Sequence, residues 1–381
     1  YEIPRLSTKV TFTADTTNPT ILVTSSTQWH RRSGSTDVVA TITDTNGIAS
    51  ATLTIDSQSV NGEAKSQDEW AFTIDLSQVG SDTTASAIPF EIRAQDRAGN
   101  EATLAGGTLK VDATAPVVTW TPDTTWHQRA PGIVVTVSAI TDGADATSAV
   151  LKNASGEAVA NGTRSGTTWS FDVDGTRLAA EGVEGEVAFA VEVTDEAGNV
   201  GVLDAMTAKL KLDGVAPQLT VLSADEWHAP GPTASVRVRV TDGGAGVSAS
   251  TVRLSGSAAC SATGVPDEFE CLVATADAPP GAESQLPVTI EASDAVSNRA
   301  TVDTLVKVDA KPPEVTLSPS ASWSTRADTI VLRGTASDTG VGIGSAAPTV
   351  AIEVNGSVVQ TLEGTYDAND GTLTFLVPGD V

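Results

Sequence analysis

The sequence repeats itself about every hundred residues, and this period limits the fold more than any other feature. Four segments begin alike, with NPTILV, APVVTW, APQLTV and PPEVTL. Their prolines, Pro19, Pro116, Pro217 and Pro313, are 97, 101 and 96 residues apart. A tryptophan follows each proline by ten residues, an aspartate precedes it by four, and another aspartate follows by 25 or 26. Chance does not keep four registers in step, so the chain is a tandem array of one structural unit.

Apolar and polar residues alternate within each repeat, as in Val38–Ile42, Trp70–Ile74 and Val187–Val191. This period of two, broken by Gly, Asn, Asp and Pro, is typical of strands. Asn355-Gly356 between two such runs predicts a hairpin. About seven short strands per repeat favour an immunoglobulin-like sandwich. We therefore expect an all-β protein of tandem immunoglobulin-like β-sandwiches in an elongated rod. In the first repeat we expect strands A, B, C, E, F and G near residues 20–26, 37–43, 51–56, 69–75, 88–95 and 107–112.

The repeat predicts the domain boundaries. Residues 1–15 match the last strand of a preceding domain, or a strand donated to a neighbouring chain. Domains 1, 2 and 3 are expected at 16–112, 113–213 and 214–309. The fourth, 310–381, is expected to be incomplete and to lack strands F and G. Two explanations remain open: a section of a longer array, or a subunit that exchanges strands with copies of itself in a filament.

Charge and composition exclude several function classes. The chain has 48 acidic and 22 basic residues, a net charge of −26, which argues against binding to nucleic acid or to anionic membranes. No apolar run is long enough to insert into a membrane. Three histidines and one methionine leave little from which to build a catalytic centre, and no nucleophile or phosphate-binding motif occurs. We expect no enzyme.

Three acidic motifs recur where strands end. They are an aspartate in the linker before each repeat, an aspartate in the B–C loop, and an Asp-x-x-x-Asn turn between strands F and G. The B–C and F–G loops lie at one end of such a sandwich, where strand A also begins, so the motifs of one repeat should meet at its junction with the preceding domain. The residues are Asp15, Asp44, Asp96 and Asn100; Asp112, Asp142, Asp195 and Asn199; Asp213, Asp242, Asp294 and Asn298; and Asp309 and Asp338.

Carboxylates gathered at one point repel one another unless water or a cation intervenes. Calcium takes six to eight oxygen ligands from Asp, Asn, backbone carbonyls and water, and extracellular modules bind it at roughly 10⁻⁴–10⁻³ M. These residues are therefore candidate Ca²⁺ ligands. Asp, Asn and Gly are also the ordinary formers of turns, and this second explanation needs no ion.

The D-x-x-x-P linkers, T-D-x-x-G loops and D-x-A-G-N turns in units of about 100 residues resemble bacterial Ig-like repeats. Such repeats occur in tandem in large extracellular, adhesin-type surface proteins. The resemblance implies a stalk or spacer at the bacterial cell surface, with Ca²⁺ at some junctions and with neighbouring domains as its partners. The resemblance is also compatible with binding of a host or surface ligand. Val296-Ser297 departs from the Ala-Gly of the turn motif.

Each tryptophan of the repeat is followed by histidine except in the fourth. The pairs are Trp29-His30, Trp126-His127 and Trp227-His228, and the fourth repeat has Trp323 alone. Their recurrence favours an inter-domain plug that closes one end of the core. The alternative is a ligand- or glycan-binding module that uses these loops.

The only cysteines, Cys260 and Cys271, are eleven residues apart. Partners across a short hairpin can meet disulfide geometry, so we predict a disulfide and an oxidising compartment. Two free thiols are the alternative.

Overall fold

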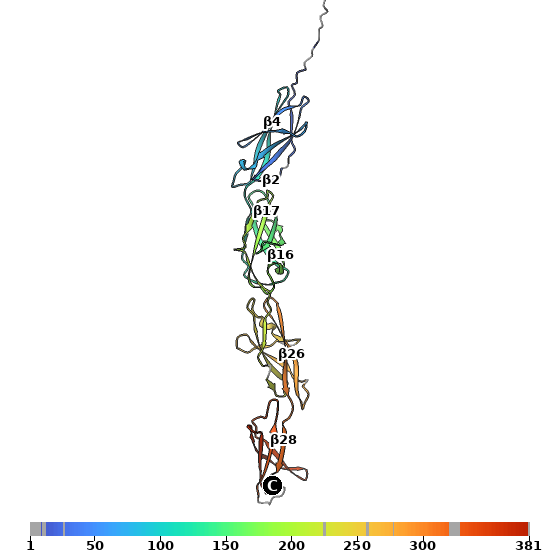
Figure 1. The fold of residues 1–381 in the computed structure, drawn as a ribbon, viewed down its shortest axis with the longest axis vertical. Coiled ribbons are helices and arrows are strands. Elements are labelled where there is room, and N and C mark those ends of the chain that lie inside the picture. Colours follow the sequence, from blue (N-terminus) through green and yellow to red (C-terminus); the bar gives the residue numbers. More distant parts are fainter. Residues whose placement is uncertain are drawn as a thin grey trace, which may run out of the picture. The chain divides into compact units, whose positions relative to one another are not determined.

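The computed structural model describes residue 9 and residues 13–25, 27–223, 226–256, 259–276, 278–319 and 328–379. The chain divides into two compact units, Tyr1–Gly214 and Val215–Val381, which we describe separately. Strands make up most of both units (Figure 1). Among the described residues, no helix has the length and apolar character needed to cross a membrane.

The first unit begins with a sandwich of two sheets. One sheet has the order β1-β3-β7-β6, from β1 (Thr20–Val23), β3 (Ser35–Thr43), β7 (Glu69–Asp75) and β6 (Glu63–Ala64). The other has the order β2-β9-β8-β4-β5, from β2 (Trp29–Arg31), β9 (Glu101–Asp112), β8 (Ser86–Asp96), β4 (Ile48–Ile55) and β5 (Gln58–Asn61). A 3₁₀ turn, η1 (Leu76–Gln78), follows β7.

Alternation along the strands produces the core between these sheets. On β3, Val38, Ala40 and Ile42 are buried, and the residues between them face outward. Phe72 on β7 and Leu53 on β4 are completely buried. Because side chains of a strand point to alternate faces, a shift of one residue would expose the whole apolar set. The buried apolar area therefore fixes the strand register.

The second sandwich of this unit repeats the plan. Its sheets have the orders β10-β12-β16-β15 and β11-β19-β17-β13-β14, with β18 paired to β17. The strands are β10 (Val117–Trp120), β11 (Trp126–Gln128), β12 (Ile133–Ile140), β13 (Ala146–Asn153), β14 (Ala158–Asn161), β15 (Thr163–Ser165), β16 (Thr168–Val173), β17 (Glu184–Asp195), β18 (Val200–Leu203) and β19 (Lys209–Asp213). A short helix, α1 (Gly175–Leu178), follows β16.

The second unit holds the third and fourth sandwiches. The third has sheets β20-β22-β25-β24 and β21-β27-β26-β23, and the fourth has β28-β29-β33-β32 and β30-β31. Their elements are β20 (Gln218–Val221), β21 (Trp227–His228), β22 (Thr233–Thr241), η2 (Ala249–Thr251), β23 (Arg253–Leu254), β24 (Ser261–Ala262), β25 (Glu268–Ala274), β26 (Glu283–Ser293), β27 (Arg299–Asp309), β28 (Glu314–Pro319), β29 (Ile330–Ser337), β30 (Thr349–Val354), β31 (Ser357–Glu363), β32 (Thr365–Asp367) and β33 (Thr372–Val377).

The all-β fold of tandem sandwiches is confirmed. Each sandwich has a hydrophobic core of its own, and the four cores share no residue. The predicted hairpin at Asn355-Gly356 joins β30 to β31, and both residues have positive φ. In the fourth sandwich, no strand of the described residues takes the F or G position. Most of residues 1–15 lie outside the described residues, so their assignment and the domain boundaries stay predictions.

The sequence did not predict β2, β11 and β21. These two- or three-residue strands leave the first sheet and pair in parallel with the last strand of the second sheet. They were missed because no run of two or three residues shows a period, and because their partners lie about 80 residues further along the chain.

Candidate cation site

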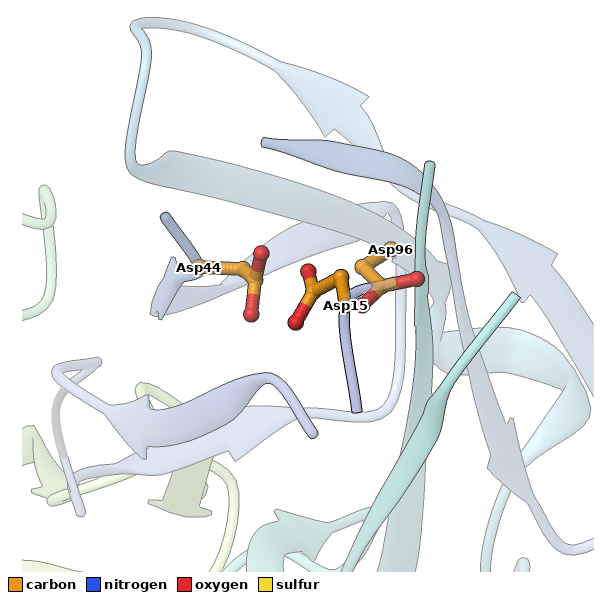
Figure 2. A group of neighbouring side chains, drawn as sticks. All are labelled: Asp15, Asp44 and Asp96. Atoms are coloured by element: carbon orange, nitrogen blue, oxygen red, sulfur yellow. The ribbon is translucent and has the colours of Figure 1, made fainter. Parts of the chain in front are cut away.

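Asp15, Asp44 and Asp96 converge at one end of the first sandwich, and we call them the first acidic group. Asp15 precedes β1, Asp44 follows β3, and Asp96 ends β8. One carboxylate oxygen of each lies within 4.8 Å of the others. Figure 2 shows the Asp15 side chain between those of Asp44 and Asp96. The structure thus brings together the linker, B–C and F–G aspartates of this repeat.

Local hydrogen bonds hold Asp15 and Asp44 in place. The backbone N–H and hydroxyl of Thr17 donate to Oδ1 of Asp15 at 3.0 and 2.6 Å, and the amide of Asn46 donates to Oδ2. Asn46 N–H donates to Oδ1 of Asp44 at 2.8 Å. The hydrogen bond from the Thr17 side chain, followed by that from Asn46, lowers the pKa of Asp15 below its ordinary value. Asp15 is therefore ionised at neutral pH.

Asp96 is buried, with 1% of its surface exposed, and Asn100 contacts both of its oxygens. The Asn100 backbone N–H donates to Oδ1 at 2.8 Å and its amide donates to Oδ2 at 2.7 Å. Burial raises the pKa of Asp96, but the bonds from Asn100 and from the N–H groups of the turn outweigh it, so that the pKa is lowered. The Asn100 amide also donates to the backbone carbonyl of Asp15 at 3.3 Å.

The amide nitrogen of Asn100 thus fastens the F–G turn to the linker, and a role of its Oδ1 as a ligand stays a prediction. The second sandwich repeats this arrangement: the Asn199 amide donates to Oδ2 of Asp195 and to the carbonyl of Asp112. In the third, the Asn298 amide donates to Asp294. The Asp-x-x-x-Asn motif therefore has a positioning role that requires no ion.

The second junction, inside the first unit, is arranged differently. The Thr114 hydroxyl lies 2.7 Å from Oδ1 of Asp112 and 2.5 Å from Oδ1 of Asp142, and its single hydrogen is donated to one of them at a time. Asp112 is only 1% exposed, and its buried Oδ2 has no hydrogen-bond partner among the described residues. Burying a carboxylate oxygen without a hydrogen-bond partner lowers the stability of the folded state. A cation or a water molecule at this oxygen would remove that cost.

Contacts across the same junction tie the first sandwich to the second. The backbone N–H of Ala85 donates to Asp142 at 3.2 Å. A Cβ atom on Gly143 would lie 2.3 Å from the Ala85 side chain and 3.3 Å from the Trp29 ring. Glycine is therefore required where the B–C loop of the second sandwich meets the end of the first, and neighbouring domains of one chain are partners.

In the second unit, the carboxylate oxygens of Asp242 and Asp294 lie within 4.8 Å of each other. Asp213, which ends β19 of the first unit, is fully buried. Asp309 and Asp338 flank the start of the fourth sandwich. Val341 N–H donates to Asp309 at 2.8 Å, and this bond is the main reason that the pKa of Asp309 is lowered.

The repeat tryptophans are half-buried, each beneath a lysine of the last strand. The ammonium nitrogens of Lys110, Lys211 and Lys307 lie 5.6, 5.7 and 6.0 Å from the ring centres of Trp29, Trp126 and Trp227. Parallel strand pairing places each lysine opposite its tryptophan. Trp323 lies outside the described residues. These contacts agree with the plug interpretation, which for Trp29 includes the approach to Gly143.

These lysines were not predicted from the sequence. A signal for them exists, since each precedes a linker aspartate by two residues. His30 is half-buried, and burial lowers its pKa. His127 contacts Asp123 at 2.8 Å, whereas His228 forms no ion pair with another described residue. The predicted disulfide Cys260–Cys271 is present, with the two Cα atoms 4.4 Å apart.

Comparison with known proteins gives one family. Residues 138–211, in the second sandwich, match the model of the bacterial Ig-like domain. The resemblance seen in the repeat motifs is thereby confirmed for this sandwich. A comparison with curated proteins gives no match.

Solved structures with a similar fold include a tetra-tandem repeat from the extending region of a large adhesion protein. It is 21% identical, with 89% of this chain and 85% of that chain covered and a TM-score of 0.34. A structure of a 1.5-MDa bacterial ice-binding adhesin is 17% identical over 78% and 100% of the chains, with a TM-score of 0.33. Fibronectin(III)-like modules of Clostridium thermocellum CbhA are 12% identical over 51% and 93%, with a TM-score of 0.30. At such TM-scores these similarities support no inference about function.

Proposed function

We propose that this chain is a structural region of a bacterial cell-surface protein, an adhesin-like stalk whose domain junctions are stiffened by Ca²⁺. The match of the second sandwich to a bacterial Ig-like domain supports the surface location. The disulfide agrees with it, because disulfides persist in oxidising compartments. No catalytic residue enters the proposal, and the absence of enzymatic activity stays a prediction.

The first acidic group is the observation that carries the calcium proposal. Its three carboxylates come from three separate segments and converge within 4.8 Å. Asp15 and Asp96 have lowered pKa values, so they stay charged at neutral pH and repel one another. Ca²⁺ prefers carboxylate oxygens and completes its shell with backbone carbonyls and water. An ion there would fasten the linker to both loops of the sandwich.

The unpartnered Oδ2 of Asp112 supports a second ion at the junction inside the first unit. A ligand at this buried oxygen would bind the end of the first sandwich and, through Asp142, the beginning of the next. Weak affinity suits such a site, because extracellular calcium is abundant enough to fill sites with dissociation constants of roughly 10⁻⁴–10⁻³ M.

Small-angle X-ray scattering of the full chain tests the stiffening, in 5 mM CaCl₂ and in EDTA at equal ionic strength. We expect a longer maximum dimension and less flexibility in calcium. The double variant Asp112→Asn/Asp142→Asn should remove part of this difference, whereas Asp37→Asn, an exposed aspartate on β3, should retain it. Superimposable curves in calcium and EDTA would contradict the proposal. Antibodies against the chain should also label intact cells of the source.

A further inference from the structure

A cavity in the second sandwich lies outside the acidic groups and the Trp-His pairs. Its volume is about 370 Å³, and it opens beside β10 and β12, where the chain leaves the first sheet. The indole of Trp120 and the apolar side chains of Val135 and Leu210 form one part of its wall. Its polar lining consists of Thr119, Thr121, Asp123, Thr136 and Ser138.

The two most distinctive residues of this cavity occur in one repeat only. Four residues after the repeat proline, where this sandwich has Trp120, the other repeats have Val23, Val221 and Leu317. Seven residues after the proline, where this sandwich has Asp123, the others have Ser26, Ala224 and Ser320. Packing of the common core does not require either residue, since three repeats manage without them.

Trp120 and Asp123 are held in fixed positions. The Trp120 ring meets the buried Phe189 edge to face, with centroids 5.2 Å apart and planes at 82°. The Thr125 N–H and hydroxyl donate to Oδ1 of Asp123 at 2.9 and 2.7 Å, and Nε2 of His127 lies 2.8 Å from Oδ2. The two Thr125 donors use both lone pairs of Oδ1, whereas Oδ2 retains one lone pair for another donor. A site with fixed side chains loses less entropy when a ligand binds.

We propose that this cavity binds a neutral saccharide of one or two sugar rings. A pyranose has an apolar C–H face that can contact an indole, and hydroxyls around its rim that donate to a carboxylate and exchange hydrogen bonds with Thr and Ser. The volume lies at the small end of the range for ligand pockets, which limits the occupant to about two rings. Asp123 and the net charge of −26 disfavour uronic and sialic acids. The site differs from the Trp126-His127 loop suggested by the sequence, because Lys211 covers the Trp126 ring.

Saturation-transfer difference NMR on the full chain tests the proposal. The probes are glucose, galactose, mannose, N-acetylglucosamine, lactose and cellobiose, with glucuronic acid and N-acetylneuraminic acid as acidic counterparts, each at 10 mM. We expect transfer to at least one neutral sugar and none to the acidic sugars. Trp120→Val, which installs the residue of the first and third repeats, should weaken binding about tenfold, as expected for loss of an aromatic anchor.

Asp123→Asn is the second variant, because it keeps the shape of the side chain and decides the question if Trp120→Val fails to fold. It should also weaken binding. Glu157→Gln, which removes an exposed charge elsewhere on this sandwich, is the control and should bind as the unchanged chain does. The proposal is overturned if no neutral sugar receives saturation, if acidic sugars receive it equally, or if folded Trp120→Val and Asp123→Asn both bind like Glu157→Gln. The calcium proposal is unaffected by any of these results.

Discussion

Replacing Asp44 by Asn should destabilise the first sandwich in calcium but not in EDTA. Asn keeps the Oδ1 acceptor for the Asn46 N–H and removes one of three charges that lie within 4.8 Å of one another. In EDTA the substitution relieves repulsion, so the melting temperature should rise or stay equal. In calcium it removes a ligand, so the melting temperature should fall.

The stabilisation of the first sandwich by bound calcium can be calculated. A ligand that binds only the folded state stabilises it by RT ln(1 + [L]/Kd). With 10 mM calcium and dissociation constants of roughly 10⁻⁴–10⁻³ M, this term is about 1.4–2.7 kcal/mol. For a domain of about 100 residues each kcal/mol shifts the melting temperature by about 4–8 °C. The melting temperature of the first sandwich in the unchanged chain should therefore rise by about 6–22 °C when calcium is added.

Differential scanning calorimetry of the full chain measures both effects. Asp37→Asn is the matched control, because it removes a charge from β3, the strand that Asp44 follows, and keeps the Oδ1 acceptor for the Thr73 hydroxyl. This control should show the calcium shift of the unchanged chain. The reasoning is refuted if Asp44→Asn lowers the melting temperature equally in calcium and EDTA, since Asp44 would then act only as a turn former.

Three further predictions concern stability. Cys260→Ala/Cys271→Ala removes a covalent link between residues eleven apart. Loop entropy predicts that the free energy of unfolding of the third sandwich falls by about 3 kcal/mol and its melting temperature, measured by calorimetry, by on the order of 10–20 °C. An unchanged melting temperature would exclude the disulfide in solution. Lys110→Met should cost about 0.5–1 kcal/mol, the usual value of an exposed cation–π contact, in urea unfolding, and an equal cost in a Trp29→Leu background would show that the ring is not its partner. Hydrogen bonds lower the folded-state pKa of Asp15 and Asp309. Their contribution to stability is therefore present above the ordinary pKa near 3.8 and is lost as the pH falls through the lowered value. In EDTA, the free energy of unfolding measured in urea should decline below about pH 4, less steeply in Asp309→Asn than in the unchanged chain, and equal slopes for both proteins would contradict this.

The sandwich was predictable because its signal is local. Alternation such as that of Val38–Ile42 places one set of side chains in the core, and the buried residues of β3 are those that the pattern indicates. The repeat then transfers this assignment to the other three units. The hairpin at Asn355-Gly356 was predictable for the same reason, since both positions have positive φ and Asn and Gly adopt it readily.

What the sequence did not show depends on partners far along the chain. Trp29 joins the second sheet only because Lys110 and its neighbours offer an open edge. Likewise, the same motif has different contacts in two repeats. Asn46 donates to Asp15 in the first repeat, whereas Thr114 lies between Asp112 and Asp142 in the second. The role of Asn100 as a donor to the Asp15 carbonyl also depends on tertiary placement. A recurring motif predicts where residues gather, and the neighbours of each copy decide their geometry.

Isothermal titration calorimetry of calcium into the full chain tests the central claim most directly. The account predicts saturable binding with a dissociation constant of roughly 10⁻⁴–10⁻³ M, and one fewer site in Asp44→Asn than in Asp37→Asn. Absence of saturable heat up to 10 mM calcium, or the same number of sites in both variants, would contradict it.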